Sequence, residues 1–361
     1  MKKFLIISVV AGLSVFLHAS IPGTRPDIVS FSAKTAAASK NKIPGSVSIK
    51  VKKEPKDKLL KALKKYYPTG YSIIASLDNY PEEIELGDSK ISISGGGSYK
   101  DYVEGGKLSE QIESLPTVVH EMNHAFTGRY GYLILQKTGG YDGDRTYYTF
   151  CIDENEAVLV DFGKTFPCKK LKDVIPAALR TSRFETYIYP ADEYMSTQQD
   201  GVFGLLDEYN AYYHDAMTVY SLFDFYHDEM KQDDATWTTY VGLCAGTYLA
   251  YAEFRYWILT YMIYAKDKQS AIYKDIIGNK LFRQVFTKID ARFTGLMTAI
   301  DKRLENVAEI LNDMGYEAEY ADGNFSIGGA AMGFERDSFD MLLKEMQKPA
   351  YKKMLTELNK I

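Results

Sequence analysis

The chain has 361 residues with 43 basic and 48 acidic side chains, and its formal net charge is −5. No basic patch stands out, which argues against a nucleic acid as a partner. The cysteines, Cys151, Cys168 and Cys244, are too few for a disulfide framework and lack C-x-x-C spacing. At most one bridge is expected, with Cys151 and Cys168 the nearest pair in sequence. The length suits one large domain or two subdomains that share a core.

The first twenty residues have the pattern of a secretory signal peptide. A basic start, Met1-Lys2-Lys3, precedes an apolar run from Phe4 to Leu17 and then the small residues Ala19 and Ser20. The run is too short for a comfortable membrane span, and no cysteine follows it for a lipoprotein anchor. We therefore expect a secreted or periplasmic protein. Residues 21–45, rich in Ser, Ala and Lys, are expected to form a flexible leader, with a short propeptide as the alternative.

The segment after the leader predicts one helix and a small sheet. Residues 57–67 have the pattern of a basic amphipathic helix. Residues 71–77 and 84–94 are typical of strands, the second interrupted by a turn at Gly87-Asp88. Glycines 95–97 then break the pattern. We expect the strands to precede the next helix as a small sheet whose edge could hold an extended peptide.

The most informative stretch is His120-Glu121-Met122-Asn123-His124, which reads H-E-x-x-H. Pro116 suits the first helical residue, and Gly128 suits the C-terminal cap. Residues four apart lie one turn above each other on a helix, so both imidazoles can face one ion. The apolar residues around them predict a buried helix, where two His and a Glu are costly unless paired or metal-bound. The stretch therefore predicts a zinc site with Glu121 beside it.

On His120, Glu121 and His124 the chain resembles the zincin metallopeptidases. The metzincin subclass has a Gly and a third His after this motif, but Thr127 and Tyr130 stand at those positions. The thermolysin-like helix is not matched either. The resemblance is therefore to the broad gluzincin type, which implies a Glu as third ligand on a later helix. It covers only the active-site helix and a little more of the chain.

Three acidic segments compete for the third ligand. Glu156 lies in a polar turn between residues 146–152 and 157–162, which have the pattern of two strands, so a hairpin tip is favoured there. Glu208 lies on a helix expected from Gly204 toward Met230, and the Glu with Ala211 three residues later is similar to the third-ligand helix of many gluzincins. Glu253 sits in an aromatic helix, where an ion pair is favoured over metal. We predict that His120, His124 and Glu208 hold one Zn²⁺.

The helix expected to carry Glu208 also carries residues that could assist a zinc site. Tyr212 shares its face at i+4 and is preferred over His214 as the donor that stabilises the oxyanion, a role that gluzincins usually give to Tyr or His. Asp207 or Asp215 could orient a ligand imidazole through its second nitrogen. His227 has no ligand-like partner at helical spacing and is not expected in the site. Glu121 and Tyr212 are thus the predicted catalytic residues.

The rest of the chain completes an α+β prediction. Residues 241–265 are apolar, but Glu253 and Arg255 interrupt them, so a buried helix is favoured over a membrane span. Beyond Gly204 the pattern is helical to the end, with a loop over residues 315–333. We predict a zincin-like domain in which a small mixed N-terminal sheet and the H-E-x-x-H helix occupy residues 46–200. A helical part, residues 201–361, carries the third ligand.

These features predict a secreted zinc metallopeptidase that acts on a peptide or protein substrate. Glu121 would take a proton from the attacking water and pass it to the leaving amine. Two alternatives stay open. One is a non-catalytic surface or binding protein that uses the many tyrosines for contacts. The other is a zinc amidase that is not a general protease.

Overall fold

The computed structural model describes residues 46–49, 51, 53–78, 80–92 and 97–360. The predicted signal peptide and leader, residues 1–45, lie outside this part of the chain. The described residues form an α+β fold in which helices predominate, as predicted. Its sheets are small and antiparallel: β1 (Glu83–Leu86) pairs with β2 (Ser89–Ser92), β3 (Thr146–Asp153) with β4 (Glu156–Phe162), and β5 (Ala318–Ala321) with β6 (Asn324–Ile327), which also pairs with β7 (Ala330–Met332).

In the first part of the chain, the described residues form four α-helices and one short 3-10 helix. They are α1 (Lys58–Tyr66), α2 (Pro68–Ser76), η1 (Tyr99–Tyr102), α3 (Leu108–Glu113) and α4 (Leu115–Thr138). The α1 helix confirms the predicted basic helix, and the Asp57 side chain caps it by accepting a hydrogen bond from the Leu59 amide at 2.7 Å. The predicted turn at Gly87-Asp88 also forms, between β1 and β2.

The strand predicted over residues 71–77 is wrong, because these residues form most of α2. A short apolar run does not distinguish a buried strand from a buried helix. Pro68 stands at the start of α2, where its fixed φ favours a helix. Every residue from Thr69 to Ala75 is buried, and α2 packs against α4. Because α2 is buried on all sides, its sequence has no polar face and therefore lacks the periodicity of an amphipathic helix.

Short elements connect the hairpin β3–β4 to the long helices of the second part. They are η2 (Cys168–Leu171), η3 (Ala177–Leu179), α5 (Phe184–Tyr187) and α6 (Ser196–Gln199). The second part then consists of α7 (Val202–Ser221), α8 (Phe223–Asp228), α9 (Asp234–Lys268), α10 (Ser270–Gly278), α11 (Lys280–Asp313), α12 (Arg336–Met346) and α13 (Pro349–Leu358). The helix expected to run from Gly204 toward Met230 is thus divided at Leu222 into α7 and α8.

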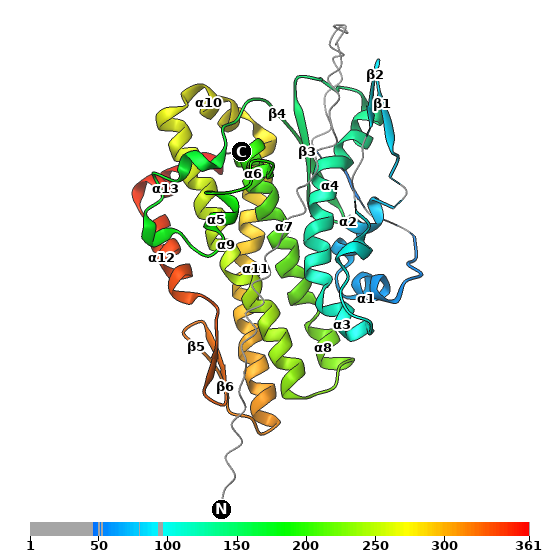
Figure 1. The fold of residues 1–361 in the computed structure, drawn as a ribbon, viewed down its shortest axis with the longest axis vertical. Coiled ribbons are helices and arrows are strands. Elements are labelled where there is room, and N and C mark those ends of the chain that lie inside the picture. Colours follow the sequence, from blue (N-terminus) through cyan, green and yellow to red (C-terminus); the bar gives the residue numbers. More distant parts are fainter. Residues whose placement is uncertain (1–45, 50, 52, 79, 93–96, 361) are drawn as a thin grey trace, which may run out of the picture.

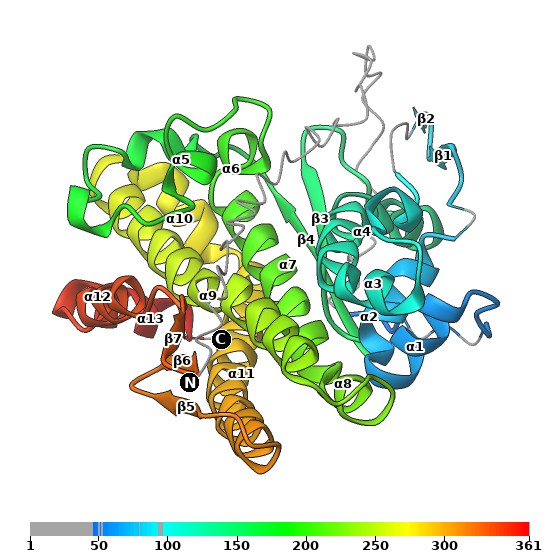
Figure 2. The same ribbon diagram turned by 60° about the horizontal axis from the view of Figure 1, so that its bottom comes forward.

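The long helix α7 lies at the centre of the molecule. It packs against α4 on one side and α9 on the other, and α11 closes the bundle (Figures 1 and 2). All residues from Val202 to Ala216 are buried. One hydrophobic core includes residues from both predicted parts, 46–200 and 201–361. None of the described helices is long and apolar enough to cross a membrane.

Two further expectations are corrected by the structure. The small mixed sheet is instead two separate antiparallel hairpins, and β1 packs against Ile134 and Leu135, beyond the His pair on α4. The loop expected over residues 315–333 contains the β5–β7 sheet, because Asp322-Gly323 supplies the positive φ values of a tight hairpin turn. The three cysteines, of which at most one pair was expected to form a bridge, are all buried and free.

Gly128 does not end the helix that carries the H-E-x-x-H motif. The α4 helix continues to Thr138 and is capped by Gly139, which has a φ of 75°. A glycine inside a helix costs about 1 kcal/mol relative to alanine. Burial of Ile134 and Leu135 against Ile84 of β1 offsets this cost. The extended helix thereby fixes the motif against both hairpins.

Two glycines on α4 give a stability prediction. A Cβ on Gly128 would meet no atom within 4 Å, whereas a Cβ on Gly131 would lie 2.7 Å from Leu159 Cδ1 and 2.8 Å from Thr149 Oγ1. We expect Gly128→Ala to stabilise the protein by up to about 1 kcal/mol. Gly131→Ala should destabilise it by about 1–3 kcal/mol through overpacking. Urea unfolding of the two variants measures both, and equal effects would contradict the close approach of α4 to β3 and β4.

Candidate metal centre

The α4 helix brings the two imidazoles of the motif together. His120 and His124 lie one turn apart, and their Nε2 atoms are 3.1 Å from each other. The side chain of His120 is 2% exposed and that of His124 is 24% exposed. His120 is therefore enclosed, whereas His124 is partly accessible to solvent.

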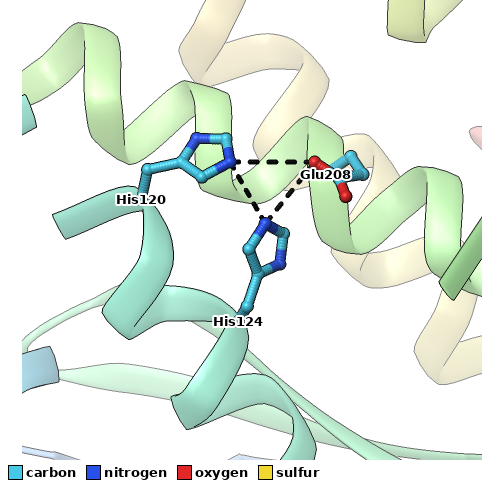
Figure 3. Close-up of side chains that lie close together, drawn as sticks. All are labelled: His120, His124 and Glu208. Carbon is cyan, nitrogen blue, oxygen red and sulfur yellow. Dashed lines mark hydrogen bonds and ion pairs between the residues drawn. The ribbon is translucent and has the colours of Figure 1, made fainter. Parts of the chain in front are cut away.

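The α7 helix places Glu208 opposite the His pair. Glu208 Oε2 lies 3.7 Å from His120 Nε2 and 3.4 Å from His124 Nε2 (Figure 3). A hydrogen bond of 3.4 Å between Asn210 of α7 and Asn123 of α4 helps to set the register of the two helices. The predicted proximity of Glu208 to His120 and His124 is confirmed. That Glu208 is a metal ligand stays a prediction.

The spacing of these three donor atoms fits a zinc ion. His120 Nε2, His124 Nε2 and Glu208 Oε2 form a triangle, and the point equidistant from them in its plane lies about 2.0 Å from each atom. Zinc bonds to imidazole nitrogen and carboxylate oxygen are about 2.0–2.2 Å long. Two imidazoles and one carboxylate are also a ligand set of catalytic zinc sites, which keep a further position open. Among the described residues, this is the one His, Cys, Asp and Glu group close enough to hold an ion.

Two carboxylates face the second nitrogens of the two imidazoles. Asp207 Oδ2 lies 2.7 Å from His124 Nδ1, and Asp215 Oδ2 lies 3.7 Å from His120 Nδ1. When Asp207 accepts the Nδ1 proton of His124, the lone pair of Nε2 faces Glu208 and is free for a metal ion. The sequence proposed Asp207 or Asp215 for this role, and the structure places one beside each imidazole.

The electrostatics of the site favour a bound cation. Burial raises the pKa of Glu208, and burial raises the pKa of Asp215 to about 7 despite the opposing effect of Arg183. At His124 burial lowers the pKa, but the charges of Asp207 and Glu208 outweigh it and the net direction is upward. Buried carboxylates thus create a negative potential at the imidazoles, which a divalent ion would balance.

Removing the carboxylate behind His124 should weaken metal binding. We expect Asp207→Asn to lower zinc affinity by about 10–100-fold, because the amide holds the imidazole less firmly and makes it less basic. Competition with a fluorescent zinc chelator measures the change. Asp228→Asn is the matched control, since Asp228 contacts the exposed His227 at 2.7 Å away from the site. Equal affinities in the two variants would contradict the role of Asp207.

Glu121 lies within electrostatic range of the candidate centre. Its side chain is half-buried, and its charge contributes to the raised pKa values of Glu208 and Asp215 after burial and other causes. Tyr102 of η1, which packs on α4, is half-buried as well. Burial raises its pKa, and the Glu121 charge is the next cause. That Glu121 acts as a base on a water in the site stays a prediction.

Tyr212 lies behind His120, and its hydroxyl is held by two neighbours. Its ring centroid is 4.5 Å from that of His120 in an edge-to-face arrangement. Its hydroxyl oxygen accepts a hydrogen bond from Arg183 Nε at 3.1 Å and lies 3.2 Å from the Tyr187 hydroxyl. Tyr212 is thus brought to the His pair, as the sequence predicts, but with partners that the sequence did not reveal.

The two other histidines in the described part of the chain have different surroundings. His214 is fully buried between Tyr67 and the Cys151 carbonyl, and burial lowers its pKa to about 4. It is therefore neutral and structural near neutral pH. His227 is exposed beside Asp228, in agreement with its predicted absence from the site.

The two competing carboxylates are engaged elsewhere. Glu253 Oε2 pairs with Arg183 Nη1 at 2.9 Å, which confirms the predicted ion pair. Arg255, which cannot face Glu253 at i+2, pairs with Asp290 instead. Glu156 follows the tip of the β3–β4 hairpin and pairs with Lys288 of α11. The hairpin tip preferred on the sequence is therefore confirmed.

Sequence reasoning missed Arg183, Tyr187 and Tyr102. Arg183 precedes the four-residue helix α5, and no motif or periodicity marks it. The buried charge of Glu253 was the only signal, because it required a cation without saying which one. No pattern distinguishes Tyr187 and Tyr102 from the other tyrosines of the chain, which has 29 in total.

Comparison with known proteins adds no relative: no family model, no curated protein and no solved structure matches this chain.

Proposed function

We propose that the protein is a secreted or periplasmic zinc metallopeptidase of the gluzincin type that hydrolyses peptide bonds. The supporting observation is the triangle of His120 Nε2, His124 Nε2 and Glu208 Oε2, whose dimensions suit zinc. Within this proposal the arrangement of α4 and α7 is zincin-like. The signal-like sequence of residues 1–20 supports export.

The roles of the residues follow from their positions. A zinc ion held by His120, His124 and Glu208 would supply a Lewis acid and make a water in the site more acidic. Glu121, which lies between the two histidines in the motif, would accept a proton from that water and carry it to the leaving amine. Asp207 would keep His124 in the tautomer that leaves Nε2 unprotonated. Tyr212 would donate a hydrogen bond to the oxyanion of the substrate.

The geometry supports an enzyme over a binding protein. A protein that only presents tyrosines for contacts needs neither a Glu between the two histidines of the motif nor carboxylates beside the second nitrogens of both imidazoles. All of these groups are present here. The partial exposure of His124 also gives a substrate access to the site, whereas His120 is enclosed.

The proposal is tested by zinc-dependent cleavage of peptides. Purified protein is stripped with a chelator, reloaded with about one equivalent of Zn²⁺ per chain and incubated with a peptide library read by mass spectrometry. We expect tight binding of one ion and cleavage that requires it. Cleavage confined to cell-wall peptides or small amides would indicate the amidase instead. A protein that binds zinc but cleaves none of these substrates would refute the catalytic function.

A further inference from the structure

Arg183 is half-buried at the centre of a polar cluster next to the candidate metal centre. Its Nη1 pairs with Glu253 Oε2 at 2.9 Å, and its Nη2 donates to the Gly246 carbonyl at 2.6 Å. Its backbone amide also donates to Glu253 Oε1 at 3.3 Å. Two groups of α9 thus hold the guanidinium in place, and its third nitrogen, Nε, is directed to the Tyr212 hydroxyl at 3.1 Å.

The donors and acceptors in this cluster determine which O–H group can still donate a hydrogen bond. A guanidinium can only donate, so the Tyr212 oxygen must accept from Arg183. The Tyr212 and Tyr187 oxygens are 3.2 Å apart, so one of the two hydroxyls donates to the other. Two phenols have two O–H hydrogens, and this contact uses one. Within the described part of the chain, neither phenol contacts a further acceptor, so one phenolic O–H remains to donate to another group.

Tyr212 lies next to the candidate metal centre, and its hydroxyl contacts that of Tyr187. Tyr212 follows Glu208 by one turn of α7, and its ring packs on His120. Burial is the largest cause of the raised pKa of Tyr187, and the charge of Glu208 is the next. Burial also raises the pKa of Tyr212, with Arg183 opposing and Glu208 adding to it. Both phenols are therefore within the electrostatic reach of the third ligand.

We propose that Arg183 is a positioning residue: it holds the Tyr212 oxygen in place, so that the Tyr212–Tyr187 hydroxyl pair presents one O–H to the oxyanion that develops on the substrate. This inference rests on the proposed peptidase function. It gives Glu253 a role as well, because Glu253 holds the arginine rather than the ion. A preorganised donor of this kind stabilises a transition state because it does not have to reorient during the reaction.

The chain contains a matched control for this cluster. Arg255 Nε pairs with Asp290 Oδ1 at 2.7 Å, and the Tyr209 hydroxyl donates to the same oxygen at 3.0 Å. The side chain of Arg255 is 17% exposed and that of Arg183 is 20% exposed. Both clusters thus combine a half-buried Arg, a carboxylate and a phenol, but only that of Arg183 contacts a tyrosine that packs on His120. Substitution of Arg255 therefore measures the effect of disturbing such a cluster without a change next to His120.

The first test is a set of variants assayed on the peptide that the library selects. Arg183→Met alone would leave Glu253 as an unpaired buried charge, so it is combined with Glu253→Leu, which removes both charges. We expect kcat to fall about tenfold or more with little change in KM, and Arg183→Lys to restore part of the rate. Arg255→Lys should leave kcat unchanged.

A double-mutant cycle separates positioning from a merely structural role. Tyr212→Phe removes the oxygen through which Arg183 acts. In that background, the loss of Arg183 and Glu253 should lower kcat little further, because coupled residues are not additive. If the two changes multiply as independent effects, Arg183 does not act through Tyr212 and the inference is overturned.

The second test uses inorganic phosphate as a tetrahedral oxyanion and needs no turnover. Its Kd for the zinc-loaded protein is measured by calorimetry, and zinc content is checked in every variant. We expect Arg183→Met with Glu253→Leu to keep zinc and to bind phosphate about tenfold more weakly than the wild type or Arg255→Lys. Equal phosphate affinity in all three overturns the inference while the proposed function stands. A wild type that binds no zinc overturns both.

Discussion

Glu121→Gln is expected to bind zinc as the wild type does and to lose about 10²–10⁴-fold in kcat. The amide has nearly the same shape as the carboxylate but cannot accept the proton of the attacking water. Glu121 is not one of the three donor atoms of the triangle, so the ion should remain bound. Zinc content and steady-state kinetics on the selected peptide measure the two expectations separately.

Glu309→Gln is the control for this substitution, because Glu309 is exposed on α11. Its kcat and zinc content should equal those of the wild type. A Glu121→Gln protein with wild-type turnover would show that another group moves the proton. A Glu121→Gln protein without zinc would show instead that Glu121 holds the ion.

Glu208→Gln is expected to abolish stoichiometric zinc binding and, with it, all hydrolysis. The neutral amide is a much poorer zinc ligand than a carboxylate, and the two imidazoles alone leave the site incomplete. Glu253→Gln should differ from Glu208→Gln in zinc content and in stability. It should keep zinc but destabilise the protein by about 3–5 kcal/mol, because Arg183 then loses its buried partner.

These two variants distinguish the ligand from the structural carboxylate. Zinc content is measured by elemental analysis after dialysis, and stability by urea unfolding of the metal-free proteins. Glu156→Gln completes the set, because Glu156 pairs with Lys288 and should retain zinc. Loss of zinc in Glu253→Gln or Glu156→Gln, with retention in Glu208→Gln, would reverse the assignment of the third ligand.

The sequence was most informative where spacing alone determines geometry. The i, i+4 relation places His120 and His124 on one face of a helix wherever that helix lies. The β-branched and aromatic flanks of Glu156 predict a hairpin, and residues 146–162 form it. Glu208 was anticipated from its ligand type, from its place on a helix with the small Ala211 on the same face, and from the resemblance, because no local pattern alone states which helix will pack against α4.

The predictions that were wrong, and the contacts that were not predicted, have identifiable physical causes. The helix α2 was predicted as a strand because burial on every side leaves its sequence without helical periodicity. The helix α4 was predicted to end at Gly128 because a glycine often caps a helix, whereas here it lies inside one. The contacts of Arg183 depend on the packing of α7 against α9 and on the short segment between η3 and α5 that carries Arg183. Such contacts are set by tertiary packing, and no single-sequence pattern encodes them.

The central claim is that His120, His124 and Glu208 bind one zinc ion. The most direct measurement is an anomalous difference map, recorded at the zinc absorption edge from crystals of the zinc-loaded protein. We predict one strong peak bonded to His120 Nε2, His124 Nε2 and a Glu208 carboxylate oxygen, each at about 2.0–2.2 Å. A peak at another group of residues, or a map without a peak from zinc-saturated protein, would contradict the account.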